Sequence, residues 1–138
     1  MAPPTKTPVF ISFDYDHDAA LKAFLVGQAK NEKSPFFIQD WSIRRASKRW
    51  KEDAKGRIRR CNVVIAICGR HTNKAAGVTA EIQIAREVGV RYALLRGYKD
   101  GRVERPAGTS WFSDEIYDWT WDNLVRLTDT RPWWQKIW

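Results

Sequence analysis

The segment NVVIAICG (62–69) is the feature that most limits how this chain can fold. Six consecutive apolar residues leave no polar side, so a strand formed from them must be buried on both faces. This pattern is typical of the central strand of a parallel sheet that helices cover on both sides. Three other short β-rich segments (8–15, 34–40 and 90–97) are expected to be its neighbours, and helical patterns lie between them.

The helical patterns cover 16–31, a segment that begins near Ser47, and 75–88, with a further short helix near 121–128. Alternation of strands and helices predicts an α/β fold: a single domain with an open, mainly parallel sheet and helices on both faces. We expect residues 1–7 to be flexible, 8–128 to form the domain and 129–138 to be an aromatic tail. In such a sheet, ligands bind at the carboxyl ends of the strands.

The net charge of +8 comes largely from residues 44–60, which hold nine Lys or Arg and two acids. No nucleic-acid-binding motif accompanies this charge, so we interpret it as a solvated helix face and expect no nucleic-acid partner. Cys61 and Cys68 do not form a metal-binding or redox spacing, which fits a reducing cytoplasm. No apolar run approaches the roughly 18 residues of a membrane span. We therefore expect a cytoplasmic protein without membrane contact.

Polar clusters follow three of the expected strands: DYDHD (14–18), DWSIRR (40–45) and GRHTNK (69–74). Neither GxxxxGK[ST] nor GxGxxG occurs, which disfavours P-loop and dinucleotide-binding enzymes. The acids of 14–18 have two interpretations, a divalent-metal site or the ordinary acidic start of a helix. We expect no metal site. His17 is interpreted as a surface or capping residue.

Glu81 interrupts the pattern of the helix over 75–88. At about 100° per residue, Val78, Ile82, Ile84, Ala85 and Val88 share one apolar arc, and Glu81 falls inside it. A carboxylate on a buried face is costly unless it is neutral, paired or functional. Two interpretations remain open: an ion pair with Arg44, Arg45 or Arg70, or a role in function.

Three stretches of the sequence resemble a known family: VFISFDYDHD (9–18), residues 63–96 around VTAEI, and IYDWTWDNL (116–124). They are similar to the Thoeris TIR-like proteins, which belong to the bacterial and archaeal TIR-like domains with a flavodoxin-type sheet. The resemblance implies an enzyme that consumes NAD⁺ in anti-phage defence. Its product would be a cyclised or otherwise modified ADP-ribose that activates a partner effector, and NAD⁺ would be a substrate rather than a cofactor.

The resemblance also implies site residues. The motif VTAEI (78–82) matches the one that carries the family's catalytic glutamate, here Glu81. A carboxylate beside the ribose would stabilise the positive charge that develops when nicotinamide leaves. Family members commonly have an aromatic residue just before the valine of this motif, where this chain has small residues. The expected substrate-binding residues are Phe13, Asp14, Tyr15, Asp40, Trp41, Arg44, Arg45, Arg70 and His71. In this set, Phe13 and Tyr15 would stack on a ring of NAD⁺, and an arginine would bind the pyrophosphate.

Two other functions remain open at this point. TIR-like domains also serve as assembly modules without chemistry, and here the helix faces or the aromatic tail would mediate self-association. The third hypothesis is a metal-dependent phosphodiesterase or nucleic-acid binder that uses the acids of 14–18 and the basic segment 44–60.

Overall fold

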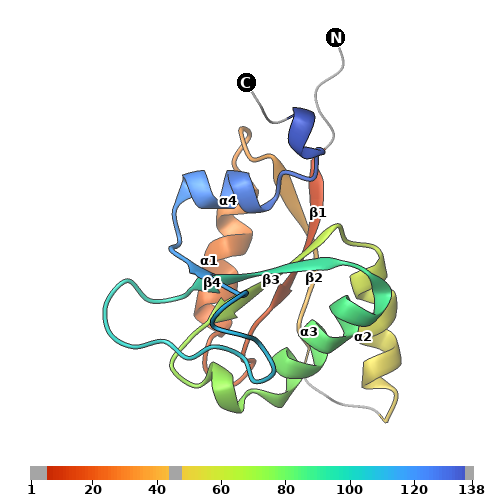
Figure 1. The fold of residues 1–138 in the computed structure, drawn as a ribbon, viewed down its shortest axis with the longest axis vertical. Coiled ribbons are helices and arrows are strands. Elements are labelled where there is room, and N and C mark those ends of the chain that lie inside the picture. Colours follow the sequence, from red (N-terminus) through yellow and green to blue (C-terminus); the bar gives the residue numbers. More distant parts are fainter. Residues whose placement is uncertain (1–5, 44–47, 136–138) are drawn as a thin grey trace.

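A computed structural model describes residues 6–43 and 48–135 of the chain. Its strands form one five-stranded sheet in the order β2-β1-β3-β4-β5, with every neighbouring pair parallel (Figure 1). The strands are β1 (Thr7–Ser12), β2 (Phe36–Trp41), β3 (Val63–Cys68), β4 (Arg91–Arg96) and β5 (Ile116–Tyr117). The α-helices are α1 (Ala19–Ala29), α2 (Trp50–Arg59), α3 (Ala76–Val88) and α4 (Trp121–Leu127), with short 3₁₀ turns at Thr72–Lys74 and Trp133–Gln135. The predicted α/β class and parallel sheet are confirmed, and this is a flavodoxin-like fold.

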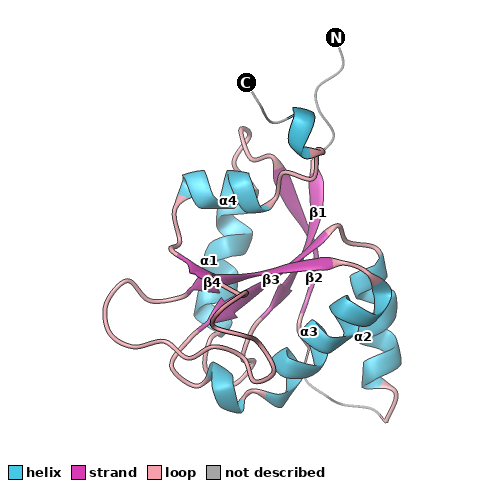
Figure 2. Cartoon of the chain, viewed as in Figure 1, coloured by secondary structure: helices cyan, strands magenta, loops and turns pink. Residues whose placement is uncertain are grey.

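The helices form a layer on each side of the sheet (Figure 2). Helices α1 and α4 contribute Leu25 and Leu124 to the core on one face. Helices α2 and α3 cover the other face, where Ile58 and Ile82 pack against the strands. Among the described residues, no helix is both long enough and apolar enough to cross a membrane.

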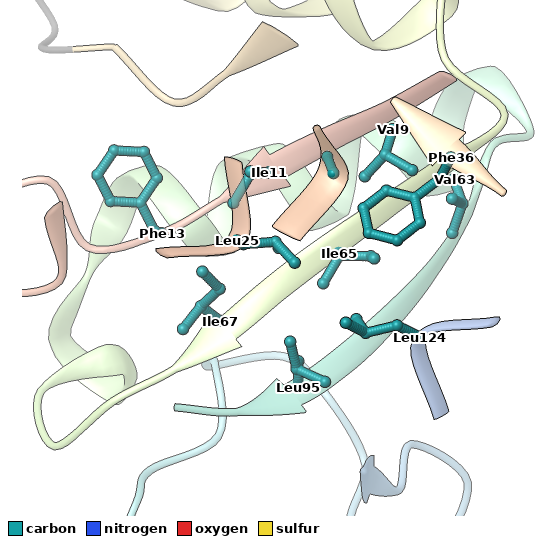
Figure 3. Packing of buried hydrophobic residues seen from close by; sticks show 11 residues of the cluster. Val9, Ile11, Phe13, Leu25, Phe36, Val63, Ile65, Ile67, Leu95 and Leu124 are labelled. Carbon is teal, nitrogen blue, oxygen red and sulfur yellow. The ribbon is translucent and has the colours of Figure 1, made fainter. Parts of the chain in front are cut away.

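Strand β3 is the centre of this arrangement, as its sequence predicts. All six of its residues are buried, and it pairs with β1 on one side and β4 on the other. Val63, Ile65 and Ile67 face the α1 side, where Figure 3 shows them beside the side chains of neighbouring elements. The intervening residues face α2 and α3. Burial on both faces explains why no polar residue interrupts this segment.

The predicted elements are all present, with differences at their ends. The strand expected over 8–15 ends at Ser12, because the acidic segment that follows forms a turn: the Asp18 amide donates to the Asp14 carbonyl at 2.8 Å. Strand β5 was not predicted. Its two residues carry no periodic pattern, and they join the sheet only through pairing with Leu94 and Leu95.

Candidate functional site

Glu81 lies on the face of α3 that packs against the sheet, as the helical pattern predicts. Val78, Ile82, Ile84 and Ala85 are buried on the same face, and Glu81 itself is only 5% exposed. Its side chain reaches the carboxyl end of β1, where the Ser12 hydroxyl donates to Oε1 at 2.7 Å. The apolar arc therefore carries the carboxyl group into the interior beside a strand end.

A second serine, directly after β2, holds the same oxygen. The Ser42 hydroxyl donates to Glu81 Oε1 at 2.5 Å and accepts a hydrogen bond from the Phe13 amide at 3.1 Å. The Ser42 amide donates to the Ile11 carbonyl at 2.9 Å, which ties the segment after β2 to β1. Three elements thus meet at one carboxyl oxygen.

A register shift between β1 and β2 brings the two serines together. Val9 pairs with Ile38 but Phe10 pairs with Asp40, so β2 has one extra residue at this point. Beyond the shift, Ile11 pairs with Trp41, and the next step places Ser12 level with Ser42. Without the extra residue, Trp41 would stand beside Ser12. Such irregularities often redirect a side chain next to a functional site.

Glu81 lines a cavity of about 390 Å³, and because the two serines hold Oε1, we assign its other carboxyl oxygen, Oε2, to the cavity side. No described residue donates a hydrogen bond to Oε2, and the only fully buried side-chain oxygen without a partner in the described part of the chain belongs to Asp18. The cavity is lined by residues 13–17 after β1, 42–43 after β2, Trp50 of α2, residues 71 and 74–78 before and within α3, and Glu81. It lies where the sheet topology predicts a ligand site.

Burial raises the pKa of Glu81 to about 7, because the charged form loses its water. The hydrogen bonds from Ser42 and Ser12 and the charge of Arg57 act in the opposite direction. No salt bridge involves Glu81 within residues 6–43 and 48–135, so a structural ion pair with Arg70 is not formed. The carboxyl group is therefore held by neutral donors and can change its ionisation state near neutral pH.

Histidines and acids form the rim of the cavity. His17 Nδ1 lies 2.7 Å from the Asp14 carboxylate, and the rings of His17 and His71 stack with their centroids 4.1 Å apart. Asp18 is buried nearby, and burial together with the charge of Asp14 raises its pKa. No group of three His, Cys, Asp or Glu side chains in the described residues could hold a metal ion.

The structure brings four of the expected substrate-binding residues to this cavity and leaves three elsewhere. Phe13, Asp14, Tyr15 and His71 line it, and the rings of Phe13 and Tyr15 stack at 5.9 Å. Arg44 and Arg45 lie outside the described residues.

Asp40, Trp41 and Arg70 do not line the cavity. Asp40 pairs with Arg57 at 3.3 Å, and the Trp41 ring lies 4.6 Å from the Lys22 ammonium group. The register shift accounts for Trp41, which pairs with Ile11 on the α1 face, while Ser42 takes the position beside Ser12. The guanidinium of Arg70 donates to the carbonyls of Asp100 and Arg102 and therefore holds the loop after β4.

Among the residues that line or build the site, sequence reasoning missed Ser12, Ser42, Trp50 and Lys74. Ser12 could have been found, because it follows Phe10 by two positions and so shares the strand face that α3 covers. Trp50 supplies an aromatic ring to the cavity. The small residues 75–77, which directly precede Val78, form part of the same wall.

Comparison with known families decides the classification of the chain. Residues 10–97, well over half of the sequence, match the family described as Thoeris protein ThsB, TIR-like domain. The chain belongs to this Thoeris TIR-like family. No curated protein matches the sequence. The matched region contains every residue that lines the cavity, from Phe13 to Glu81, and ends directly after β4.

Proposed function

We propose that this TIR-like protein is an NAD⁺-cleaving enzyme of anti-phage defence and that Glu81 is its catalytic carboxylate. The observation that carries the proposal is the arrangement of the Glu81 carboxyl group. It is buried, its Oε1 is held by two serine hydroxyls, and its Oε2 faces a cavity at the carboxyl ends of the strands.

The chemistry requires a negative charge next to the ribose. Breaking the bond between nicotinamide and ribose leaves positive charge on the sugar, and the ionised carboxylate at Oε2 stabilises that charge in the transition state. A site with little water strengthens this attraction. With a pKa of about 7, a substantial share of Glu81 is ionised at neutral pH.

The cavity wall offers partners for the rest of a dinucleotide. The aromatic rings of Phe13, Tyr15 and Trp50 can stack on nicotinamide or adenine, and the ammonium group of Lys74 can pair with the pyrophosphate. The volume of about 390 Å³ falls within the range of roughly 300–1,000 Å³ that is typical of small-molecule sites.

In this proposal NAD⁺ is the substrate and no other cofactor is needed. Water or a nucleophile of the substrate itself captures the ribosyl cation, which gives ADP-ribose or a modified ADP-ribose. That product would activate a partner effector protein, as the family resemblance implies. The protein would act in the cytoplasm, where NAD⁺ is available.

Nicotinamide release tests the proposal directly. The purified protein and Glu81→Gln are incubated with NAD⁺, and the products are separated by liquid chromatography. We expect Glu81→Gln to lose about 10²–10⁴-fold in rate. Glu87→Gln is the matched control, because Glu87 lies exposed on the same helix. Equal release by wild type and Glu81→Gln, or none from wild type, would contradict the proposal.

A further inference from the structure

We infer that Ser42, supported by Ser12, is a positioning residue that holds Glu81 Oε1 and thereby keeps Oε2 oriented toward a ligand in the cavity. The inference rests on the proposed function and adds to it the device that orients the carboxylate. The geometry around Ser42 determines the direction of each hydrogen bond.

The Ser42 hydroxyl has a single proton, and the contacts show where it goes. Its oxygen already accepts from the Phe13 amide at 3.1 Å, which orients the hydroxyl group. Of its two acceptors, Glu81 Oε1 lies at 2.5 Å and the Ile11 carbonyl at 3.5 Å, so the proton is donated to Glu81. Ser12 donates to the same oxygen at 2.7 Å from the neighbouring strand.

The two hydrogen bonds that Oε1 accepts also determine the orientation and protonation of Oε2. They fix the rotation of the carboxyl group, since any turn about its last bond would break both hydrogen bonds. They also exclude a proton from Oε1, because the hydrogens of two hydroxyl groups already point at that atom. When Glu81 is protonated, its proton therefore resides on Oε2. The same oxygen faces the cavity in both ionisation states, which preorganises it for one ribose hydroxyl.

Other charges act on Glu81 as well. The charged or titratable groups around it are Arg57 on α2, Asp40 on β2, Asp14, Tyr15, Asp16 and His17 after β1, and His71 and Lys74 before α3. None of them accepts or donates a hydrogen bond to Ser42 among the described residues. Removal of the Ser42 hydroxyl consequently changes the support of Oε1 without removing any of these charges.

Two measurements test the inference, and only one needs enzymatic activity. The first follows the side-chain carboxyl carbon of Glu81 by ¹³C NMR over pH in wild type, Ser42→Ala, Ser12→Ala and Ser42→Thr. The second measures kcat and KM for nicotinamide release over the same pH range. Ser34→Ala is the control: Ser34 is also buried, just before β2 at the opposite end of the strand, and among the described residues its hydroxyl bonds only to the Phe36 backbone.

We expect Ser42→Ala to raise the Glu81 titration midpoint by about one pH unit or more, because the ionised form loses a hydrogen bond. The acid limb of the kcat profile should move by the same amount, kcat should fall about tenfold or more, and KM should change little. Ser12→Ala should act in the same direction, Ser42→Thr should restore the wild-type behaviour, and Ser34→Ala should lower stability only.

An unchanged Glu81 midpoint in Ser42→Ala would overturn the inference. The inference would also be overturned if Ser42→Ala lost stability as Ser34→Ala does but kept the wild-type pH profile and kcat. If wild type releases no nicotinamide, the proposed function is wrong, and Oε2 has no catalytic role in NAD⁺ cleavage. In that case the NMR titration still reports whether Ser42 holds the carboxyl group, so the two failures can be told apart.

Discussion

Replacing Glu81 by Gln should stabilise this protein at alkaline pH. The two side chains have nearly the same shape, and a glutamine oxygen can accept the hydrogen bonds that Ser12 and Ser42 donate to Oε1. The amide differs in that it is never charged. The substitution therefore isolates the cost of placing a negative charge at a side chain that is only 5% exposed.

The raised pKa sets the size and the sign of the effect. The pKa of Glu81 is about 7 in the folded protein, against an ordinary value of 4.5 for a glutamate in water. Below pH 4.5 the group is protonated in both states and folding carries no charge penalty. As the pH rises through about 7, the unfolded chain is ionised while the folded one resists ionisation, so stability is lost. At 1.36 kcal/mol per pKa unit, the full loss is about 3 kcal/mol.

Urea denaturation at pH 4.5, 5, 6, 7 and 8, followed by tryptophan fluorescence, measures this difference. The free energy of unfolding of Glu81→Gln minus that of wild type should increase by about 3 kcal/mol between pH 4.5 and 8. In thermal unfolding this corresponds to roughly 10 °C in Tm for a chain of this length. Titrating groups that the two proteins share cancel in the comparison.

Glu87→Gln again serves as the control, because the exposed carboxylate of Glu87 should change stability by no more than about 0.5 kcal/mol at any of these pH values. If the difference between Glu81→Gln and wild type were the same at pH 5 and pH 8, the carboxyl group of Glu81 would not be costly to ionise. The reasoning from burial to raised pKa would then be wrong.

Two further predictions concern the strand ends and the thiols. Gly69→Ala should destabilise the fold by about 1–3 kcal/mol, since a Cβ there would lie 2.3 Å from the buried Asp18 Oδ2. Gly56→Ala in α2 should stabilise the fold by about 0.5–1 kcal/mol, because a Cβ there would have no atom within 4 Å. Equal urea midpoints for the two variants would contradict this prediction. Cys61 and Cys68 are buried, and burial raises the pKa of both thiols to about 12. A thiol reagent at pH 8 should therefore label them only when the protein unfolds. Rapid labelling of the native protein would refute their burial.

Much of the fold follows from patterns that the sequence carries locally. The unbroken apolar run of β3 predicts a central parallel strand, and the 3.6-residue period of α3 predicts that Glu81 is buried. Strand β5 escapes such reasoning because two residues have no period. The position of Arg70 escapes it as well, since its partners lie in a loop whose path no pattern predicts.

The serines that hold Glu81 show a different limit. Ser12 and Ser42 are small and polar, so no periodicity distinguishes them. Their meeting depends on the one extra residue in β2 that shifts the register between Val9 and Phe10. A regular pairing would place Trp41 rather than Ser42 beside Ser12. Register is a property of two paired strands, and neither strand's sequence specifies this shift by itself.

The cost of Glu81 also bears on which role it serves. A purely structural residue at this position would need only to accept the hydrogen bonds of Ser12 and Ser42, and glutamine would do so without the penalty of a buried charge. No salt bridge in the described part of the chain offsets that penalty. What glutamine cannot provide is a negative charge at Oε2, the atom that faces the cavity. A glutamate that weakens the fold at neutral pH and presents its charge to an open site has the properties of a group that acts on a ligand.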